Sequence, residues 1–342
     1  MYEKDYVDIT GRRVRGGARH HKSMEEKELE RRDVELKATM LEKGRQEIEE
    51  QFLTPKAEVF VETDEIKELK DRVGVWIDLG YPVHIVGPTG CGKTMLAVHV
   101  ASKLGRPAVW LNGDEEMTTT HLVGGYGQFF EEHYHDRYIH NVYKSRDVAE
   151  PGWVDNPLTI ACKYGYTLIY NEFSRAKPEA NNILLSVLEE RILELPTKYG
   201  EERYVKVHPD FKAILTSNSV EYAGVHRPQD ALLDRMVALH MNYYNLDTEV
   251  EIVKAHAGIP EKEAKNVVKF VRNLREKLPD AEKPGTRACI MIAQGLQAWN
   301  GYDKKNYENV CFDVLGGKIK GLGEQSKMHE SIKEAFLSLS KS

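Results

Sequence analysis

The stretch Gly87-Pro88-Thr89-Gly90-Cys91-Gly92-Lys93-Thr94 has the G-x-x-x-x-G-K-T spacing of a phosphate-binding loop. It follows the apolar run Val83–Val86 and opens a helical pattern from Thr94 to Leu104, the context that the motif requires. Its glycines let successive backbone N–H groups turn towards phosphate oxygens, and the helix start adds partial positive charge. Lys93 is placed to reach the β and γ phosphates, and the Thr94 hydroxyl to bind magnesium. The stretch therefore predicts a site for ATP and Mg²⁺.

Further short apolar runs predict the sheet around this loop. They are Ala108–Leu111, Thr167–Tyr170, Ala213–Thr216 and Val237–Met241. Helical patterns separate several of them, so we expect an αβα sandwich with a five-stranded parallel sheet. After Asn245 these runs stop, and residues 246–300 show amphipathic helical patterns such as Glu261–Lys277. We expect three parts: an N-terminal extension (1–52), an α/β domain (53–245) and a small all-helical lid with a C-terminal tail (246–342).

Composition narrows the class of protein. The chain has 342 residues, enough for more than one folded part. Its net charge of −6 is too mild to suggest a dedicated nucleic-acid binder. No stretch approaches the roughly 18 apolar residues of a membrane span, and the N-terminus has no apolar run. The four cysteines are scattered without metal-ligand spacing, which indicates a reduced, cytoplasmic protein.

The first 52 residues leave two interpretations open. Residues 1–22 are polar and locally basic, which fits either a solvated tail or a docking arm. Ser23–Gln51 predicts one charged helix, because Ser23 and Glu26 fit a capping box. Its apolar stripe is thin, so the helix either binds a partner or is exposed.

Polar residues close two of the predicted strands. Asn171 and Glu172 follow the run Thr167–Tyr170, as the magnesium-shell and catalytic residues of a Walker B motif do. Asn171 can accept a hydrogen bond from a magnesium-bound water but lacks the usual charge, whereas Glu172 is a candidate general base. Alone, the pair could equally cap a helix. Asn218, at the end of another strand, could orient the attacking water.

Two arginines are candidates for contact with the γ-phosphate. Arg235 ends a helical segment before the last predicted strand, where it could project into the nucleotide site of a neighbouring subunit. Arg287 begins a helix in the predicted lid and could reach the γ-phosphate from that side. Each could instead be an ordinary surface arginine.

Other candidate residues carry weaker signals. His133 and His135 alternate in a polar segment without a third metal ligand, which favours a surface loop. Cys91 lies in the phosphate loop, but nothing in the sequence indicates a reactive thiol. Arg175 and Lys177 could serve the nucleotide, a ring interface or the surface.

The ordered set of loop, Walker B pair, Asn218, Arg235 and Arg287 resembles an AAA+ ATPase. Longer stretches between these elements are more specific. They are Gly80–His84, Leu122–Tyr126, Tyr138–Val142, Trp153–Asn156, Asn171–Asn182, Glu221–His226 and Arg287–Ala293. They resemble the MoxR branch, and within it the gas vesicle protein N family. The resemblance spans about Val61 to Ala298.

The resemblance implies a role for each matching residue. Gly87–Thr94 would bind ATP, Thr94 and Asn171 would bind Mg²⁺, and Glu172 would be the catalytic carboxylate. Asn218 would be sensor 1, Arg235 the arginine finger and Arg287 sensor 2. It also implies a hexameric ring that acts on other gas vesicle proteins, touching them through loops in Gly124–Asp155. Two alternatives stay open: a nucleotide-binding scaffold with little turnover, suggested by Asn171, or a MoxR-type chaperone for another client.

Overall fold

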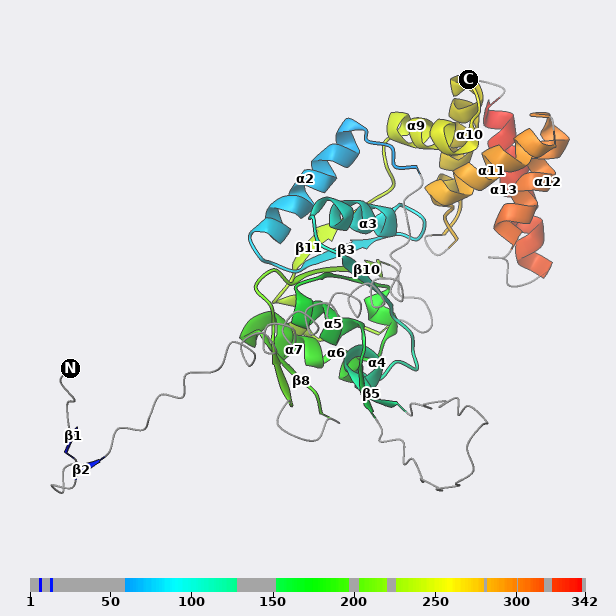
Figure 1. Ribbon diagram of the computed structural model, residues 1–342. Coiled ribbons are helices and arrows are strands. Elements are labelled where there is room, and N and C mark those ends of the chain that lie inside the picture. The colour runs from blue at the N-terminus through cyan, green and yellow to red at the C-terminus, as the bar shows by residue number, and fades with distance from the viewer. Residues whose placement is uncertain are drawn as a thin grey trace, which may run out of the picture. The chain divides into compact units, whose positions relative to one another are not determined.

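The computed structural model describes residues 6–7, 13–14, 59–127, 152–196, 203–219, 226–279, 282–299, 301–316 and 322–339 (Figure 1). The chain separates into two units, Met1–Gln51 and Phe52–Ser342. In the first, short strands β1 (Tyr6–Val7) and β2 (Arg13–Val14) pair antiparallel. The predicted helix Ser23–Gln51 lies outside the described residues. Everything below concerns the second unit.

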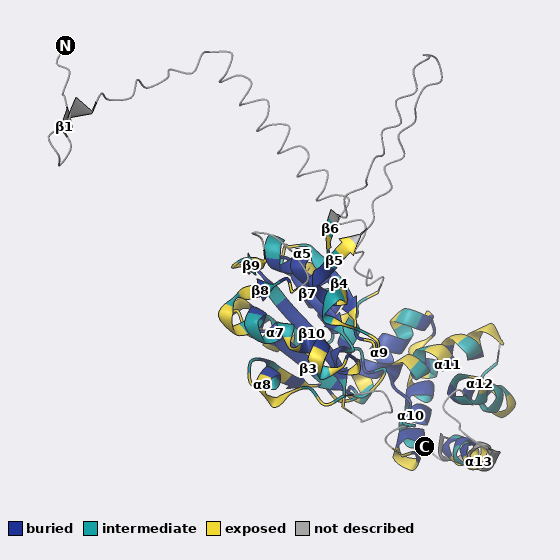
Figure 2. Cartoon of the chain, turned by 90° about the horizontal axis from the view of Figure 1, so that it is seen from below, coloured by how far each residue is buried: buried dark blue, intermediate teal, exposed yellow. Residues whose placement is uncertain are grey.

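A five-stranded parallel sheet lies at the centre of this unit, in the order β11–β3–β10–β7–β4. Its strands are β3 (Val83–Gly87), β4 (Ala108–Asn112), β7 (Thr167–Asn171), β10 (Lys212–Asn218) and β11 (Val237–His240). The five predicted strands are therefore confirmed. The strands at its centre are buried because helices cover both faces, which explains their continuous apolar runs (Figure 2).

Helices α2 (Asp64–Asp78) and α3 (Lys93–Lys103) lie on one face of the sheet (Figure 1). The other face carries α4 (Thr119–Val123), α5 (Pro157–Tyr164), α6 (Pro178–Asn181) and α7 (Ile183–Leu185). A short α8 (Asp230–Leu233) precedes β11. Helix α3 begins at Lys93, within the phosphate-loop motif and one residue earlier than the predicted start at Thr94.

Two β-hairpins leave this core, and the sequence patterns did not predict either of them as paired strands. The first joins β5 (Gly124–Gly127) to β6 (Gly152–Asp155), and residues 128–151 between them lie outside the described part. The second joins β8 (Ile192–Glu194) to β9 (Tyr204–Lys206) between β7 and β10. Their strands are too short to give a clear alternating pattern.

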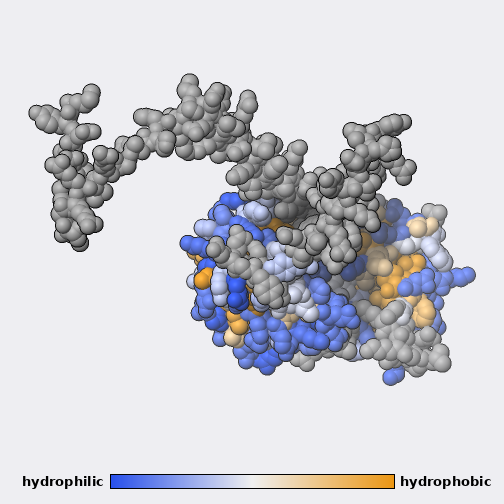
Figure 3. Space-filling view, turned by 60° about the horizontal axis from the view of Figure 1, so that its bottom comes forward, coloured by the Kyte–Doolittle hydropathy of each residue, from blue (hydrophilic) through white to orange (hydrophobic). Residues whose placement is uncertain are grey.

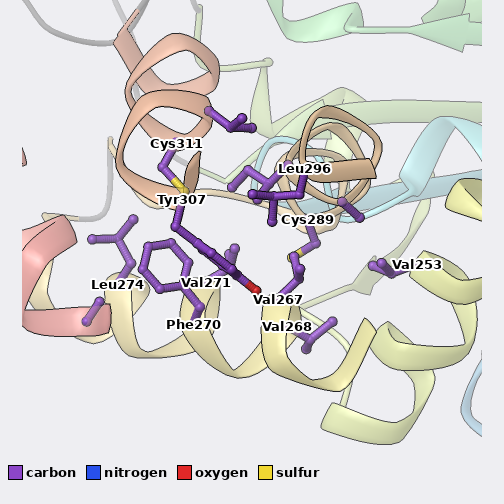
Figure 4. Packing of buried hydrophobic residues seen from close by; sticks show 14 of the residues in the cluster. Val253, Val267, Val268, Phe270, Val271, Leu274, Cys289, Leu296, Tyr307 and Cys311 are labelled. Atoms are coloured by element: carbon purple, nitrogen blue, oxygen red, sulfur yellow. The ribbon is translucent and has the colours of Figure 1, made fainter. Parts of the chain in front are cut away.

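Five helices form a second hydrophobic core, which we call the C-terminal helical region. They are α9 (Leu246–Ala257), α10 (Glu261–Lys277), α11 (Thr286–Ala298), α12 (Lys304–Gly316) and α13 (Leu322–Leu339). Helix α10 has the predicted bounds. Val267 and Leu274 of α10 face Leu296 of α11 and Tyr307 of α12 in this core (Figure 4).

Most of the described surface that Figure 3 shows is hydrophilic, and its main hydrophobic area lies on the side of the C-terminal helical region. Within the described ranges, no helix combines the length and apolar character needed to cross a bilayer.

Candidate nucleotide-binding site

The phosphate loop leaves the end of β3 and enters α3 through a tightly packed turn. Gly90 and Gly92 have φ angles of 77° and 98°, a left-handed conformation that favours glycine. At Gly87 the constraint is steric, because a Cβ there would lie 2.5 Å from the Met241 carbonyl oxygen. The glycine spacing seen in the sequence thus follows from backbone shape and from close packing against the segment after β11.

Lys93, the first residue of α3, is buried with 6% of its surface exposed. Its Nζ donates to the carbonyl oxygens of Gly87 and Pro88 at 2.9 and 2.8 Å, and to Asn218 Oδ1 at 3.0 Å. These contacts use the three donors of an ammonium group. Burial lowers the pKa of Lys93, an effect that the negative charge of Glu172 opposes. The side chain is thereby fixed along the loop, between the ends of β3 and β10.

Asn171 lies at the centre of a network of neutral side chains. Its Oδ1 accepts hydrogen bonds from the hydroxyls of Thr94 and Thr216, each at 2.8 Å. Its Nδ2 donates to Asn112 Oδ1 at 3.0 Å across the β4–β7 ladder, in which Asn112 and Asn171 are paired residues. The amide oxygen of Asn171 therefore lies next to the hydroxyl of Thr94, the other residue of the predicted magnesium site.

Glu172 follows β7 with a φ angle of 55°, unusual for a residue other than glycine. Its backbone N–H donates to Thr216 Oγ1 at 3.2 Å. The amide of Asn218 donates to its two carboxylate oxygens at 3.2 and 3.0 Å. Strained backbone at such a position is common at functional sites, and here it turns the carboxylate towards Asn218.

The C-terminal helical region reaches the loop at the start of α11. The backbone N–H of Arg287 donates to the Gly90 carbonyl at 3.3 Å. A Cβ on Gly285 would lie 2.6 Å from the Thr89 carbonyl oxygen and 2.8 Å from that of Gly90, so glycine permits this approach. The backbone of Arg287 therefore lies beside the phosphate loop, and its predicted contact with the γ-phosphate stays a prediction.

Arg235 is held elsewhere. It follows α8, where its guanidinium pairs with Glu189 through Nε, at 2.6 Å from Oε2, and through Nη2. Its Nη1 donates to the Ala231 carbonyl at 2.6 Å. The structure therefore brings together Lys93, Thr94, Asn171, Glu172, Asn218 and the backbone of Arg287. Arg235 instead bonds to Glu189 and Ala231 of the same chain.

A cavity beside the loop was not predicted. It is lined by Val59, Phe60, Val61, Ile66, Gly90, Cys91, Gly92, Met95, Tyr244, Ile252, His256, Thr286, Arg287 and Ile290. Segments before α2, along the loop and in the C-terminal helical region contribute to it. Only the fold brings these distant segments together, so no local pattern in the sequence could have revealed it.

The weaker sequence candidates have different outcomes. Cys91 is fully buried, and burial raises the pKa of its thiol, which favours the unreactive interpretation. Arg175 and Lys177 are exposed. His133 and His135 lie outside the described residues. Asn112 and Thr216, which orient Asn171, were missed because their role depends on which strands are neighbours.

The parallel sheet, the phosphate loop after β3 and the polar ends of β7 and β10 define a P-loop ATPase of the AAA class. In agreement, residues 82–236 match the AAA domain of the dynein-related subfamily. The gas vesicle ATPase GvpN of Haloferax mediterranei is 51% identical over 288 residues, covering 84% of this chain and 81% of that protein. GvpN1 of Halobacterium salinarum is 48% identical, covering 92% and 90%.

The chain belongs to the gas vesicle ATPase GvpN family, and the resemblance noted in its sequence is confirmed. A more distant similarity extends to the protein CbbQ of Hydrogenophilus thermoluteolus, which is 27% identical over 63% of this chain and 73% of that protein.

Proposed function

We propose that this ATPase binds and hydrolyses Mg-ATP in order to assemble or remodel gas vesicle proteins in the cytoplasm. The observation that carries the chemical part is the continuous contact from Lys93 through Asn218 to Glu172. It joins a phosphate-binding cation to a carboxylate through a single amide. Membership of the GvpN family supports the gas vesicle part.

The phosphate loop is proposed to hold the triphosphate through Gly87, Pro88, Thr89, Gly90, Cys91, Gly92, Lys93 and Thr94. Lys93 would exchange its carbonyl acceptors for β and γ phosphate oxygens, which are stronger partners because they are charged. The neighbouring cavity, with Val61 and His256 among its lining residues, is suited to the base of the nucleotide.

The side chains at the predicted magnesium position fit that ion in part. Thr94 and Asn171 offer oxygen atoms, which Mg²⁺ prefers, and their contact at 2.8 Å makes them close neighbours. The set lacks the carboxylate usual at the Asn171 position, so the phosphates would provide most of the negative charge. When bound there, the ion would neutralise charge on the phosphates.

Glu172 is proposed as the general base that takes a proton from the attacking water. Asn218 holds its carboxylate and Lys93 together, and would keep both aligned with the γ-phosphate. Arg287 would approach that phosphate from the C-terminal helical region, which we propose to be a lid that changes its angle on hydrolysis.

We also propose a ring, expected to be a hexamer, in which Arg235 leaves Glu189 and enters the site of a neighbouring subunit. Arg235 is partly exposed, with 30% of its side-chain surface accessible, and it follows the end of α8, a position from which it could reach a neighbouring subunit. The hairpin β5–β6 and the segment it carries would contact other gas vesicle proteins, and the lid motion would move it.

The test of this function is ATP hydrolysis by the wild-type protein and by Glu172→Gln at matched oligomeric state. The variant keeps the shape of the side chain but cannot accept the proton, so turnover should fall about 100-fold or more. The control Glu179→Gln changes an exposed carboxylate on α6. Equal turnover in wild type and Glu172→Gln would reject Glu172 as the base.

Asn171 favours a second candidate, an ATP-dependent scaffold with slow turnover. Its amide oxygen is neutral and already accepts two hydroxyl hydrogen bonds. If the missing charge limits catalysis, Asn171→Asp should raise turnover strongly. A wild-type rate that is already brisk, and unchanged in Asn171→Asp, would dismiss the scaffold.

A third candidate is a chaperone for another client, because the chain also matches the proteins CbbQ and NorQ. Deleting the gene and assaying for buoyant vesicles separates this candidate from the first.

A further inference from the structure

Glu249 is a carboxylate with no exposed surface, in the first turn of α9. Its Oε2 accepts from Arg272 Nη1 at 3.0 Å and from Arg275 Nη1 at 2.9 Å. Its Oε1 accepts from Arg275 Nη2 at 2.5 Å and from Thr286 Oγ1 at 2.9 Å. These four hydrogen bonds compensate for the burial of the charge. We call Glu249, Arg272 and Arg275 the Glu249 cluster.

The cluster holds the connection from β11 to α9. Arg272 Nη1 also donates to the Tyr244 carbonyl at 3.0 Å, and the Arg275 guanidinium lies 4.1 Å from the centre of the Tyr243 ring. Tyr244 in turn packs against the phosphate loop, where a Cβ on Gly92 would lie 3.2 Å from its hydroxyl oxygen.

The same cluster holds the turn that begins α11. Arg275 Nε donates to the Pro284 carbonyl at 2.6 Å, and Thr286 donates to Glu249. Gly285, between these two contacts, meets the carbonyl oxygens of Thr89 and Gly90. Arg287 follows directly. The cluster therefore contacts two segments, the Tyr243–Tyr244 connection and the Pro284–Thr286 turn, and each of them touches the phosphate loop.

Stability alone does not account for this arrangement. Buried ion pairs often stabilise a fold no better than apolar side chains of similar size. A pair that only held α9 to α10 would also need no contact with the Tyr243–Tyr244 connection or the Pro284–Thr286 turn. Those contacts are directed at the two segments that touch the loop.

We propose that the Glu249 cluster positions Arg287 against the phosphate loop and ties that position to the Tyr243–Tyr244 connection. Glu249 and its two arginines are positioning residues, because they act on the nucleotide through Arg287 and the loop. Any displacement of the loop then moves the Tyr243–Tyr244 connection and the start of α11 together. This inference rests on the proposed role of Arg287 at the γ-phosphate.

The test uses Thr286→Val, which removes the contact between Glu249 and the turn but leaves both arginines paired with Glu249. Its kcat and KM for ATP are compared with those of Arg287→Ala and of the double variant. We expect Thr286→Val to lower kcat/KM about fivefold, the effect of one lost hydrogen bond. The decrease in kcat/KM should come from kcat and from KM in the same proportions as it does in Arg287→Ala. The double variant should be no worse than Arg287→Ala alone, because Thr286 acts through Arg287.

Two controls separate positioning from folding. Thr286→Ser keeps the hydroxyl and should restore wild-type kinetics. Ile332, on α13, is fully buried in the hydrophobic core of the C-terminal helical region and lies far along the chain from the cluster. Ile332→Ala opens a cavity there and should lower Tm without changing kcat or KM. If Ile332→Ala changes KM as Thr286→Val does at equal loss of Tm, the proposal is overturned.

The remaining outcomes are also decisive. Wild-type kinetics in Thr286→Val, or losses that add in the double variant, would overturn the positioning role while leaving the function of Arg287 intact. Wild-type kinetics in Arg287→Ala would instead reject the proposed function of Arg287, and the positioning role with it.

Discussion

The side-chain amide of Asn218 contacts both carboxylate oxygens of Glu172, and its oxygen accepts from Lys93 at 3.0 Å. One residue at the end of β10 therefore fixes the relative position of a cation and an anion that come from α3 and the end of β7. The charges of Lys93 and Glu172 are kept apart by an amide that satisfies both.

Replacing Asn218 should slow hydrolysis more than it weakens binding. Asn218→Ala removes the support of Glu172, so kcat should fall about 10- to 100-fold with little change in KM, as for other residues that support a catalytic group. Asn218→Asp cannot donate to Glu172 and repels it, so it should be at least as slow. Steady-state kinetics would settle this, and a wild-type kcat in Asn218→Asp would show that the hydrogen bond is not needed.

Mixing two inactive variants should restore turnover if Arg235 acts on a neighbouring site. In a ring assembled from equal parts of Glu172→Gln and Arg235→Ala subunits, about a quarter of the sites combine an intact Glu172 with a neighbour's intact Arg235. The activity of the mixture should approach that fraction of wild type. A mixture no faster than its two components would contradict a shared site.

His84 makes the stability of the sheet depend on pH. It is buried on β3, where its Nε2 lies 2.7 Å from Ser217 Oγ, and burial, helped by the charge of His240, lowers its pKa to about 4. An unfolded histidine has a pKa near 6.5, so below that pH the unfolded chain binds a proton that the folded chain resists. The contribution of neutral His84 to the free energy of unfolding is present above pH 6.5 and is lost as pH falls towards 4, by about 3 kcal/mol in all.

Urea unfolding at several pH values, for wild type and for His84→Gln, isolates this contribution. Glutamine can still bond to Ser217 but does not titrate, so the stability difference between the two proteins should shrink as pH falls from 7 to 5. A difference that is constant with pH would contradict the assignment to His84.

Gly285→Ala should weaken ATP binding. The new Cβ would meet the carbonyl oxygens of Thr89 and Gly90, which belong to main chain and cannot rotate away. We expect the Kd for ATP to rise about tenfold, as for an overpacked contact that costs between 1 and 3 kcal/mol. The matched control is Gly74→Ala within α2, where nothing lies within 4 Å and alanine favours the helix. Titration with a fluorescent ATP analogue measures both, and an unchanged Kd in Gly285→Ala would contradict the close approach.

The sequence predicts the sheet and the phosphate loop well, for a physical reason. Parallel strands buried on both faces are continuous apolar runs, and the loop motif has a fixed residue spacing that can be read directly from the sequence. Helix α10 is equally clear, since a single apolar face repeats along its whole length.

The neighbours of each strand are what the sequence did not reveal. Asn112 and Thr216 reach Asn171 only because β4 and β10 flank β7, and runs of apolar residues do not encode that order. The contact of Arg235 with Glu189 joins two distant parts of the chain, so no local sequence pattern predicts it. The roles of Glu172, Asn218, Arg235 and Arg287 stay predictions until the variants are measured.

The pairing of Arg235 with Glu189 bears on how a ring would come apart. A guanidinium that already has a carboxylate partner does not leave a bare cation when its neighbour departs. Joining the proposed ring therefore exchanges one anion for another, and leaving it reverses the exchange at small cost. Under this proposal a single subunit would be electrostatically complete at Arg235, so assembly and separation would both be reversible steps for that residue.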